Sequence, residues 1–442
     1  MHFNHTNNNL IMLDSESLNI IEWEKILVNI FIILLFVCIN PLFALILCGF
    51  LNLTTSRINF WIFTFMFALS YALLFYLKDY SQILYQMRGI AGNLYTTDIG
   101  SAVNTFNDIN NISWFGIVDR FITNPNGNEP LFWLYVKTAN ILLFGNASIF
   151  VFFHYFVMFV LIAFLGKIVD NKKFVIIVTC ILLSNFTTLS NLYEVWRQTT
   201  AFLLFFIGIF LFDARERKWL PRIIIYSTVL VHISMVIIIV FYEFFDYFTK
   251  RSYKFDISKL YSKEIVGYIV TVALIFFFFI NENYLLRVAQ YFGLYDWLVM
   301  YYLVLSPGIP DSGILFNWFT YLILLSLWFR RKKISNVDVF IVLQYFLFIV
   351  FLNELSVPDV FSRFTHFVLL GGTIIVGRLL AFDFRFGSIL LTFIFIHFYY
   401  NLHFNANFNE GFSFRLFTEY MNPVYGLGRM ILNSDILLNF PI

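Results

Sequence analysis

The chain has 442 residues, of which 60% are hydrophobic, only 13% are charged and 60 are phenylalanine. A soluble globular protein of this length needs more polar surface than such a composition supplies, so a soluble protein is excluded. The formal net charge of +2 indicates no class of partner by itself, because in a membrane protein the distribution of charge along the chain carries that information.

Apolar runs long enough to cross a hydrocarbon core of about 30 Å recur between residues 26 and 402. They predict an all-α, polytopic integral membrane bundle of about 10–12 transmembrane segments, with residues 1–442 in a single multi-pass domain. The expected spans are residues 26–53, 58–77, 148–166, 174–190, 195–212, 265–281, 313–329, 338–352, 361–380 and 386–402.

The loops between these spans differ in charge, and this difference predicts the topology. Lysine and arginine dominate loops 167–173, 213–222 and 330–333, which the positive-inside rule places in the cytoplasm. Acidic residues dominate loops 78–130, 282–312 and 353–360, which therefore face outward. The N-terminus and the tail at 404–442 are expected on that same periplasmic side.

Two segments are not expected to cross the membrane once as a single helix. The run 223–248 begins and ends at basic loops, so we expect two short legs or a re-entrant hairpin with its apex near His232. Residues 131–145 predict an interfacial helix, which closes an outward region at 78–145. The loop 78–130 within that region is long for a bare connector, which favours a functional role.

Arginines at the outer ends of two spans are candidate anion-binding residues. Arg197 begins the span 195–212, and Arg363 occupies the matching position on 361–380. A guanidinium presents a planar fork of donors that suits phosphate. The alternative for both residues is an interfacial anchor, with Arg197 paired to Glu194 on the same helical face.

Other ionisable groups are candidates for proton transfer or binding. Between Arg222 and Glu243, His232 is the only Asp, Glu, His, Lys or Arg residue, and it is either a packing residue or a general base. Arg88, Asp98 and Glu129 lie in the long outward loop, where solvated side chains are the alternative. His154 and His366, on apolar runs, are expected to be structural.

No motif for nucleotide binding, serine hydrolysis or zinc binding occurs in the sequence. Cys38, Cys48 and Cys180 stand singly within apolar runs and read as small core residues. We therefore expect no cofactor, no metal and no nucleic-acid partner.

Several short motifs follow one another in a characteristic order. They are Arg88, Thr97-Asp98, the stretch Glu129-Pro130-Leu131-Phe132-Trp133, Trp196-Arg197-Gln198, His232 with Ser234, Arg363, and Asn422-Pro423-Val424-Tyr425. In this order, on a phenylalanine-rich polytopic chain, they resemble the EpsG branch of the Wzy-type polysaccharide polymerases. These bacterial enzymes build O-antigen, capsule or exopolysaccharide, and the resemblance covers residues 85 to 428.

The resemblance implies a glycosyltransferase that polymerises oligosaccharide repeat units carried on undecaprenyl diphosphate, at the periplasmic face of the inner membrane. Besides this substrate and the bilayer, it implies a chain-length regulator as a partner. An O-antigen ligase and a lipid-linked-sugar flippase or transporter are the alternatives. The implied roles are diphosphate binding for Arg197, Arg363 and Arg88, and sugar binding for Gln198 and Tyr425. Proton acceptance is implied for His232, with Asp98 second and Glu129 third. The alternative for Glu129 is to orient the arginines or to bind sugar hydroxyls.

Overall fold

The computed structural model describes residues 98–123, 129–169, 196–214, 219–249, 266–270, 334–354 and 359–380, with isolated positions at 31, 65, 68, 69, 72, 323, 324 and 327. Every regular element in this part of the chain is a helix. The expected all-α class is therefore confirmed for these residues. The predicted spans 174–190 and 386–402, and most of 26–53, 58–77, 265–281 and 313–329, lie outside them.

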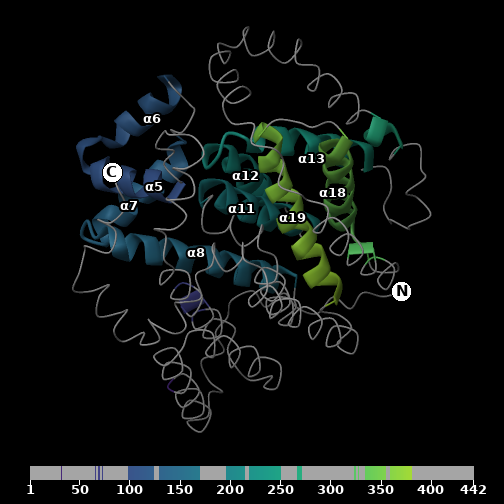
Figure 1. Cartoon of the computed structure of the whole chain (residues 1–442), viewed down its shortest axis with the longest axis horizontal. Helices are drawn as coiled ribbons and strands as arrows, with labels where there is room; N and C mark the ends of the chain where they lie inside the picture. The colour runs from purple at the N-terminus through teal and green to yellow at the C-terminus, as the bar shows by residue number, and fades with distance from the viewer. Residues whose placement is uncertain are drawn as a thin grey trace.

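The helices follow one another as shown in Figure 1. Where a predicted span is fully described, its ends agree with the observed helix to within two residues. Two of these helices, Ile149–Ile168 and Trp196–Asp213, are the ones within the described residues that are long and apolar enough to cross a membrane. The elements are α5 (Asp98–Asp108), η1 (Ile109–Asn111), α6 (Trp114–Thr123), α7 (Pro130–Leu142), α8 (Ala147–Ile168), α11 (Trp196–Ala214), α12 (Trp219–Ser227), η2 (Thr228–Leu230), α13 (Met235–Thr249), α18 (Asn336–Glu354) and α19 (Asp359–Leu380).

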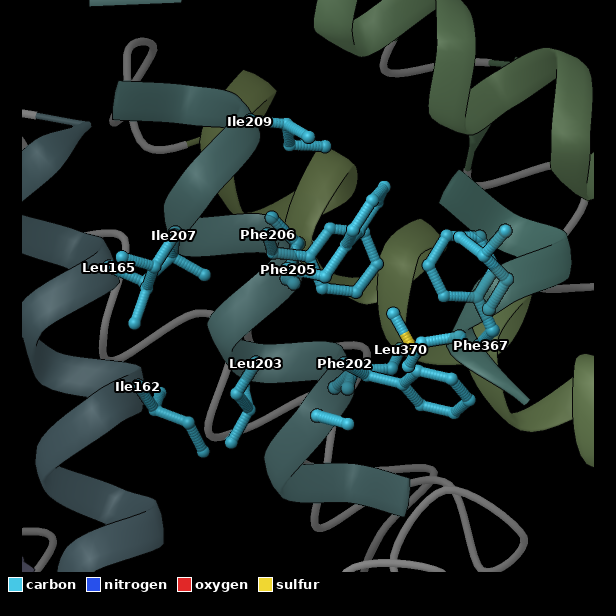
Figure 2. Close-up of a cluster of buried hydrophobic side chains, with 14 of the residues drawn as sticks. Ile162, Leu165, Phe202, Leu203, Phe205, Phe206, Ile207, Ile209, Phe367 and Leu370 are labelled. Atoms are coloured by element: carbon cyan, nitrogen blue, oxygen red, sulfur yellow. The ribbon is translucent and has the colours of Figure 1, made fainter. Parts of the chain in front are cut away.

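Helix α11 forms the centre of the described core. Its apolar side chains surround the helix instead of forming one stripe, which is the pattern of a helix buried on all sides. Figure 2 shows Leu203 and Ile207 directed toward α8, while phenylalanines on the opposite face meet α19. The ring of Phe206 stacks on that of Phe367 with centroids 5.1 Å apart.

Two glycines allow neighbouring helices to approach this core closely. A Cβ at Gly208 would lie 2.7 Å from Cγ1 of Ile225, which brings α12 against α11. A Cβ at Gly371 would lie 2.8 Å from Cγ2 of Ile341 and 3.1 Å from Cζ of Phe206, where α19 meets α18 and α11. Any side chain at either position therefore separates the helices.

Substitution of Gly208 by alanine is expected to lower the free energy of unfolding by about 1–3 kcal/mol, because the added methyl group overfills a packed interface. Thermal unfolding of the detergent-purified protein measures this loss. Gly267→Ala is the matched control, because its new Cβ would lie 3.7 Å from Phe248, an ordinary contact distance. Equal melting temperatures for the two variants would contradict the close packing of α12 on α11.

The run 223–248 forms the expected hairpin, in the two helical legs α12 and α13 joined by η2. Two polar contacts show that the legs run antiparallel. Tyr226 Oη donates to Oε1 of Glu243 at 2.7 Å, and Arg222 Nη2 lies 3.7 Å from Oδ2 of Asp246. His232 lies in the turn between the legs, which places it at the apex of the hairpin.

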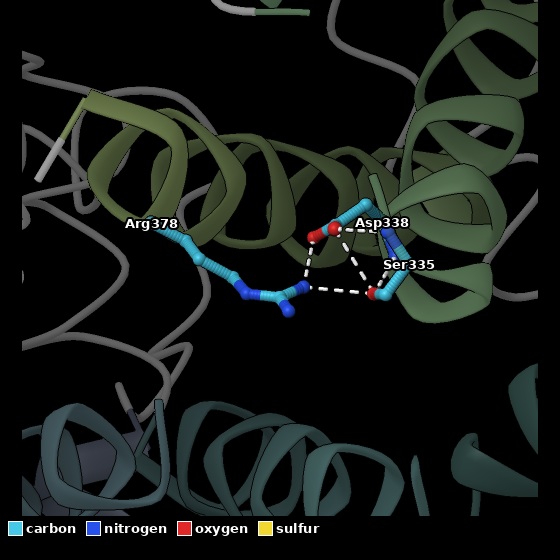
Figure 3. Close-up of polar contacts among 3 residues, drawn as sticks. All are labelled: Ser335, Asp338 and Arg378. Atoms are coloured by element: carbon cyan, nitrogen blue, oxygen red, sulfur yellow. Dashed lines mark hydrogen bonds and ion pairs between the residues drawn. The ribbon is translucent and has the colours of Figure 1, made fainter. Parts of the chain in front are cut away.

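A second polar cluster joins α18 and α19. Ser335 and Asp338 form a reciprocal cap at the start of α18, where Asp338 accepts hydrogen bonds from the backbone N–H of Ser335 at 2.8 Å and from its hydroxyl at 2.9 Å. Arg378, in the last turn of α19, donates to both side chains (Figure 3). Its guanidinium also covers the ring of Phe210 on α11 at 5.1 Å. This cluster therefore marks one end of the core.

Arg197 lies 13 residues before Phe210 on α11, or about 20 Å along the helix axis. From the loop charges, we expect the Arg378 end to face the cytoplasm and the Arg197 end to face outward. Helix α19 runs parallel to α11, because Phe367 contacts Phe202 while Arg378 reaches Phe210. The two ends of α11 thus carry separate polar clusters.

The region 78–130, expected to face outward between two spans, contains helices in its described part. Residues 98–123 form α5, η1 and α6. Phe106 of α5 is buried and stacks on Phe150 of α8, with ring centroids 4.4 Å apart. These helices are 11 and 10 residues long, so a search for membrane-length apolar runs passes over them.

Candidate functional site

Glu129 occupies the residue before the first turn of α7, and Pro130 is the first residue of the helix. Acidic residues at this position commonly cap a helix by accepting a backbone N–H. The carboxylate of Glu129 makes no such capping bond. Its side chain instead points toward two residues from distant segments of the chain.

The carboxylate of Glu129 binds Arg197 with one oxygen and His232 with the other. Arg197 Nη1 lies 3.0 Å from Oε2, and Nδ1 of His232 lies 3.0 Å from Oε1. Glu129 is only 1% exposed, whereas the side chain of Arg197 is 17% exposed. The three residues come from the start of α7, the start of α11 and the apex of the hairpin. The structure therefore unites three of the residues that the sequence selected.

Opposing influences act on the ionisation of Glu129. Burial raises its pKa, but the hydrogen bond with His232 and the positive charge of Arg197 lower it, and together they hold the pKa below its ordinary value of 4.5. The carboxylate is therefore ionised at neutral pH. An ionised carboxylate can only accept hydrogen bonds, so Nδ1 of His232 must be the donor.

This hydrogen bond determines which nitrogen of His232 is basic. With the proton on Nδ1, the neutral imidazole carries its lone pair on Nε2. Nε2 is buried and has no hydrogen-bond partner within the described structure. A buried polar atom without a partner is costly, by about 1–3 kcal/mol, and such atoms often mark chemical function.

Helix α7 is held in place by bonds to the preceding helices. The ammonium of Lys137 is buried and donates to the backbone carbonyls of Ile109 and Ile112. The amide of Asn140 donates to the carbonyl of Phe106 at 2.7 Å. From one face of α7, these two side chains thus donate hydrogen bonds to backbone carbonyls near the end of α5 and around η1. Glu129 is therefore carried by a helix of fixed position.

A cluster of aromatic side chains packs around Arg197 and the residue before it. The ring of His154 lies nearly parallel to the indole of Trp196, with centroids 4.1 Å apart. Nδ1 of His154 lies 3.1 Å from the hydroxyl of Tyr135, which joins α8 to α7. The guanidinium of Arg197 covers the ring of Phe132 at 5.9 Å. His154, which is expected to be structural, thus packs against Trp196, the residue before Arg197.

The remaining predicted site residues are placed less completely. Gln198 is buried beside Arg197 on α11. Asp98 is the first residue of α5, and Arg363 lies one turn before Phe367 on α19, toward the Arg197 end of the core. The side chains of Asp98 and Arg363, and the whole of Arg88 and Tyr425, lie outside the described residues.

Sequence reasoning missed the role of Tyr135 and the stacking of His154 on Trp196. The available signal was the presence of Tyr135 and His154 on apolar helices, but nothing in the sequence indicates that the two side chains contact each other. The predicted pairing of Arg197 with Glu194 concerns a residue outside the described segments; the structure pairs Arg197 with Glu129. Within the described residues, no cluster of His, Cys, Asp and Glu is arranged to hold a metal ion.

The fold and site define a helical membrane protein with a buried carboxylate held between an arginine and a histidine at one end of its central helix. The chain belongs to the EpsG family, whose model matches residues 83–420, or 338 of the 442 residues. This is a family of polysaccharide polymerase-like membrane proteins, and the resemblance seen in the order of the motifs is confirmed. Neither a curated protein nor a solved structure matches the chain.

Proposed function

We propose that this protein polymerises oligosaccharide repeat units carried on undecaprenyl diphosphate, at the periplasmic face of a bacterial inner membrane. The observation that carries the proposal is the contact of Glu129 with both Arg197 and His232. Through Glu129, a guanidinium that can bind a diphosphate and an imidazole that can accept a proton are held in one site. The periplasmic orientation, and a polytopic bundle of about 10–12 spans, rest on the lengths of the apolar runs and the charges of the loops.

The reaction is a glycosyl transfer between two lipid-linked saccharides. A hydroxyl oxygen of the acceptor attacks the anomeric carbon of the donor, and a new carbon–oxygen bond forms as the bond from that carbon to the diphosphate breaks. The bonding electrons leave with undecaprenyl diphosphate, and the hydroxyl proton passes to a base. Negative charge grows on the departing diphosphate, so cations near it lower the barrier.

In this proposal Nε2 of His232 accepts the proton. Glu129 keeps the proton of the neutral ring on Nδ1 and stabilises the imidazolium that forms, as a carboxylate does beside a catalytic histidine. A positioned base contributes about 10²–10⁴-fold to a rate. Because Nε2 is buried, neighbouring side chains must move when the acceptor binds. Asp98 remains the second candidate for the base.

Arg197 is proposed to bind the diphosphate, with Arg363 and Arg88 contributing further positive charge. Glu129 contacts Nη1 of Arg197 and orients its guanidinium, which carries five N–H donors in all. The position of Arg363 on α19, toward the same end of the core, supports a shared site. Gln198 and Tyr425 are proposed to bind sugar hydroxyls, and a chain-length regulator is the proposed protein partner.

The decisive experiment compares surface polysaccharide from cells lacking the gene with cells restored by wild type or by His232→Asn. The asparagine amide can replace Nδ1 as a donor to Glu129, but it has no counterpart of Nε2. We expect deletion to leave chains of one repeat unit and wild type to restore the ladder. His232→Asn is expected to lower polymer by about 10²–10⁴-fold at equal protein abundance.

Other outcomes would redirect the proposal. Full restoration by His232→Asn would show that the histidine serves only to hold Glu129, and the base would have to be sought elsewhere. Loss of even the single repeat unit on deletion would favour a ligase or a flippase. An unchanged ladder on deletion would contradict polymerase function altogether.

A further inference from the structure

Helix α6 exposes a continuous stripe of large apolar side chains. At about 100° per residue, Trp114, Val118, Ile122 and Phe115 fall within roughly 100° of one another around the helix. All four are exposed, and Phe115 and Ile122 are 88% and 73% exposed. Asp119 and Thr123 lie outside this stripe, at about 140° and 180° from Trp114 around the helix. Helix α6 is therefore amphipathic, with its apolar stripe directed away from the protein.

The other face of α6 is fixed to α7. Ile117 is buried with Ile109 and Ile112, and Trp133 of α7 packs against this small cluster. The guanidinium of Arg120 covers the ring of Trp133 at 5.5 Å, and the ammonium of Lys137 lies 5.1 Å from the ring centroid of Trp114. The exposed stripe therefore belongs to a rigid pair of helices.

A second exposed apolar group lies at the other end of α7. Ile141, Leu142 and Phe144 are all exposed, and Phe144 is 96% exposed. Gly145 follows with a φ of 73°, and the apolar helix Ile149–Ile168 begins within a few residues. A helix of that length and composition is able to cross a hydrocarbon core, and a crossing by it would put the preceding turn at the membrane boundary.

We infer that the α6 stripe (Trp114, Phe115, Val118, Ile122) and the α7–α8 turn (Ile141, Leu142, Phe144) form one surface that binds the phospholipid bilayer, inserted at the boundary between headgroups and acyl chains. We argue the occupant from continuity, because α7 connects the stripe directly to a helix that is long and apolar enough to span a bilayer. Amphipathic helices bind such boundaries with their apolar face buried about 5–10 Å. Trp114 at the edge of the stripe is a residue type enriched at that depth.

This surface has a consequence for the site, because α7 carries Glu129 at its other end. Lipid contact along α6 and at the α7–α8 turn would hold α7 at the depth of the headgroups. Lipid contact at this surface does not depend on the proposed glycosyl transfer, so it can be measured without measuring polymer.

The test places a single cysteine at Phe115, Ile122 or Phe144 after Cys38, Cys48 and Cys180 are replaced by serine. Each purified full-length variant is labelled with an environment-sensitive fluorophore and reconstituted into phosphatidylglycerol and phosphatidylethanolamine nanodiscs. Matched controls carry the cysteine at Asp119 or Thr123, which are exposed but lie outside the stripe. Quenching is measured with lipids that carry a spin label near the headgroup and with aqueous iodide.

We expect labels at the three apolar positions to be quenched at least threefold more by the spin-labelled lipid than the control labels, and correspondingly less by iodide. Equal quenching by iodide at stripe and control positions would overturn the inference. Protection of the stripe from both quenchers would also overturn it, because a protein, such as a second copy of the chain, would then cover the surface. Lipid contact at Phe144 but not at Phe115 or Ile122 would exclude α6 from the membrane.

Discussion

Replacement of Glu129 by glutamine is expected to lower polymer formation by about 10²–10⁴-fold while leaving the protein in the membrane. The amide has nearly the shape of the carboxylate but no charge, so it cannot stabilise an imidazolium at His232. If the NH₂ group of the glutamine pointed toward Arg197, two hydrogen-bond donors would also face each other. The length of surface polysaccharide, normalised to protein abundance, measures the effect.

Glu243→Gln is the matched control for this variant. Glu243 accepts a hydrogen bond from Tyr226 between the legs of the hairpin, and a glutamine oxygen can accept the same bond. We expect this variant to retain the wild-type ladder. A wild-type ladder from Glu129→Gln as well would mean that the charge of Glu129 is not needed, and the assigned roles of Glu129 and His232 would both fail.

Replacement of Arg197 by alanine is expected to affect both stability and activity. The change leaves a carboxylate that is 1% exposed without its cationic partner, and breaking a buried ion pair in this way typically costs about 3–5 kcal/mol. Loss of one positioned donor near a developing charge raises the reaction barrier by about 3–4 kcal/mol, or about 10²–10³-fold in rate. Thermal unfolding and the polysaccharide ladder measure the two effects separately.

Two further variants separate these effects. Arg222→Ala is a control for the loss of an arginine, because its pair with Asp246 is longer and more exposed and should contribute less than about 1 kcal/mol. The double variant Glu129→Gln, Arg197→Gln removes both buried charges and is expected to recover much of the lost stability without restoring polymer. Recovery of polymer along with stability would show that Arg197 acts in folding and not on substrate.

The contacts of Glu129 show why the sequence could select these residues but not arrange them. Arg197 and His232 stand 68 and 103 residues from Glu129, and no local spacing rule connects such positions. Charge in the loops predicted only that all three face the same side of the membrane. The acidic residue before Pro130 would ordinarily be assigned to a helix cap, and only its burial between two distant groups shows another role.

The sequence by itself determined the class of the fold, the ends of α8, α11, α18 and α19, the hairpin around His232 and the family. The family follows from the order of the short motifs. The other features follow from the length of apolar runs and from loop charge, because a bilayer imposes both on any chain that crosses it. The tertiary structure alone decided that Glu129 joins Arg197 to His232, that His154 stacks on Trp196, and that residues 98–123 are helical. Such contacts depend on side-chain packing between segments far apart in the chain, and hydrophobic pattern does not encode which distant surfaces meet.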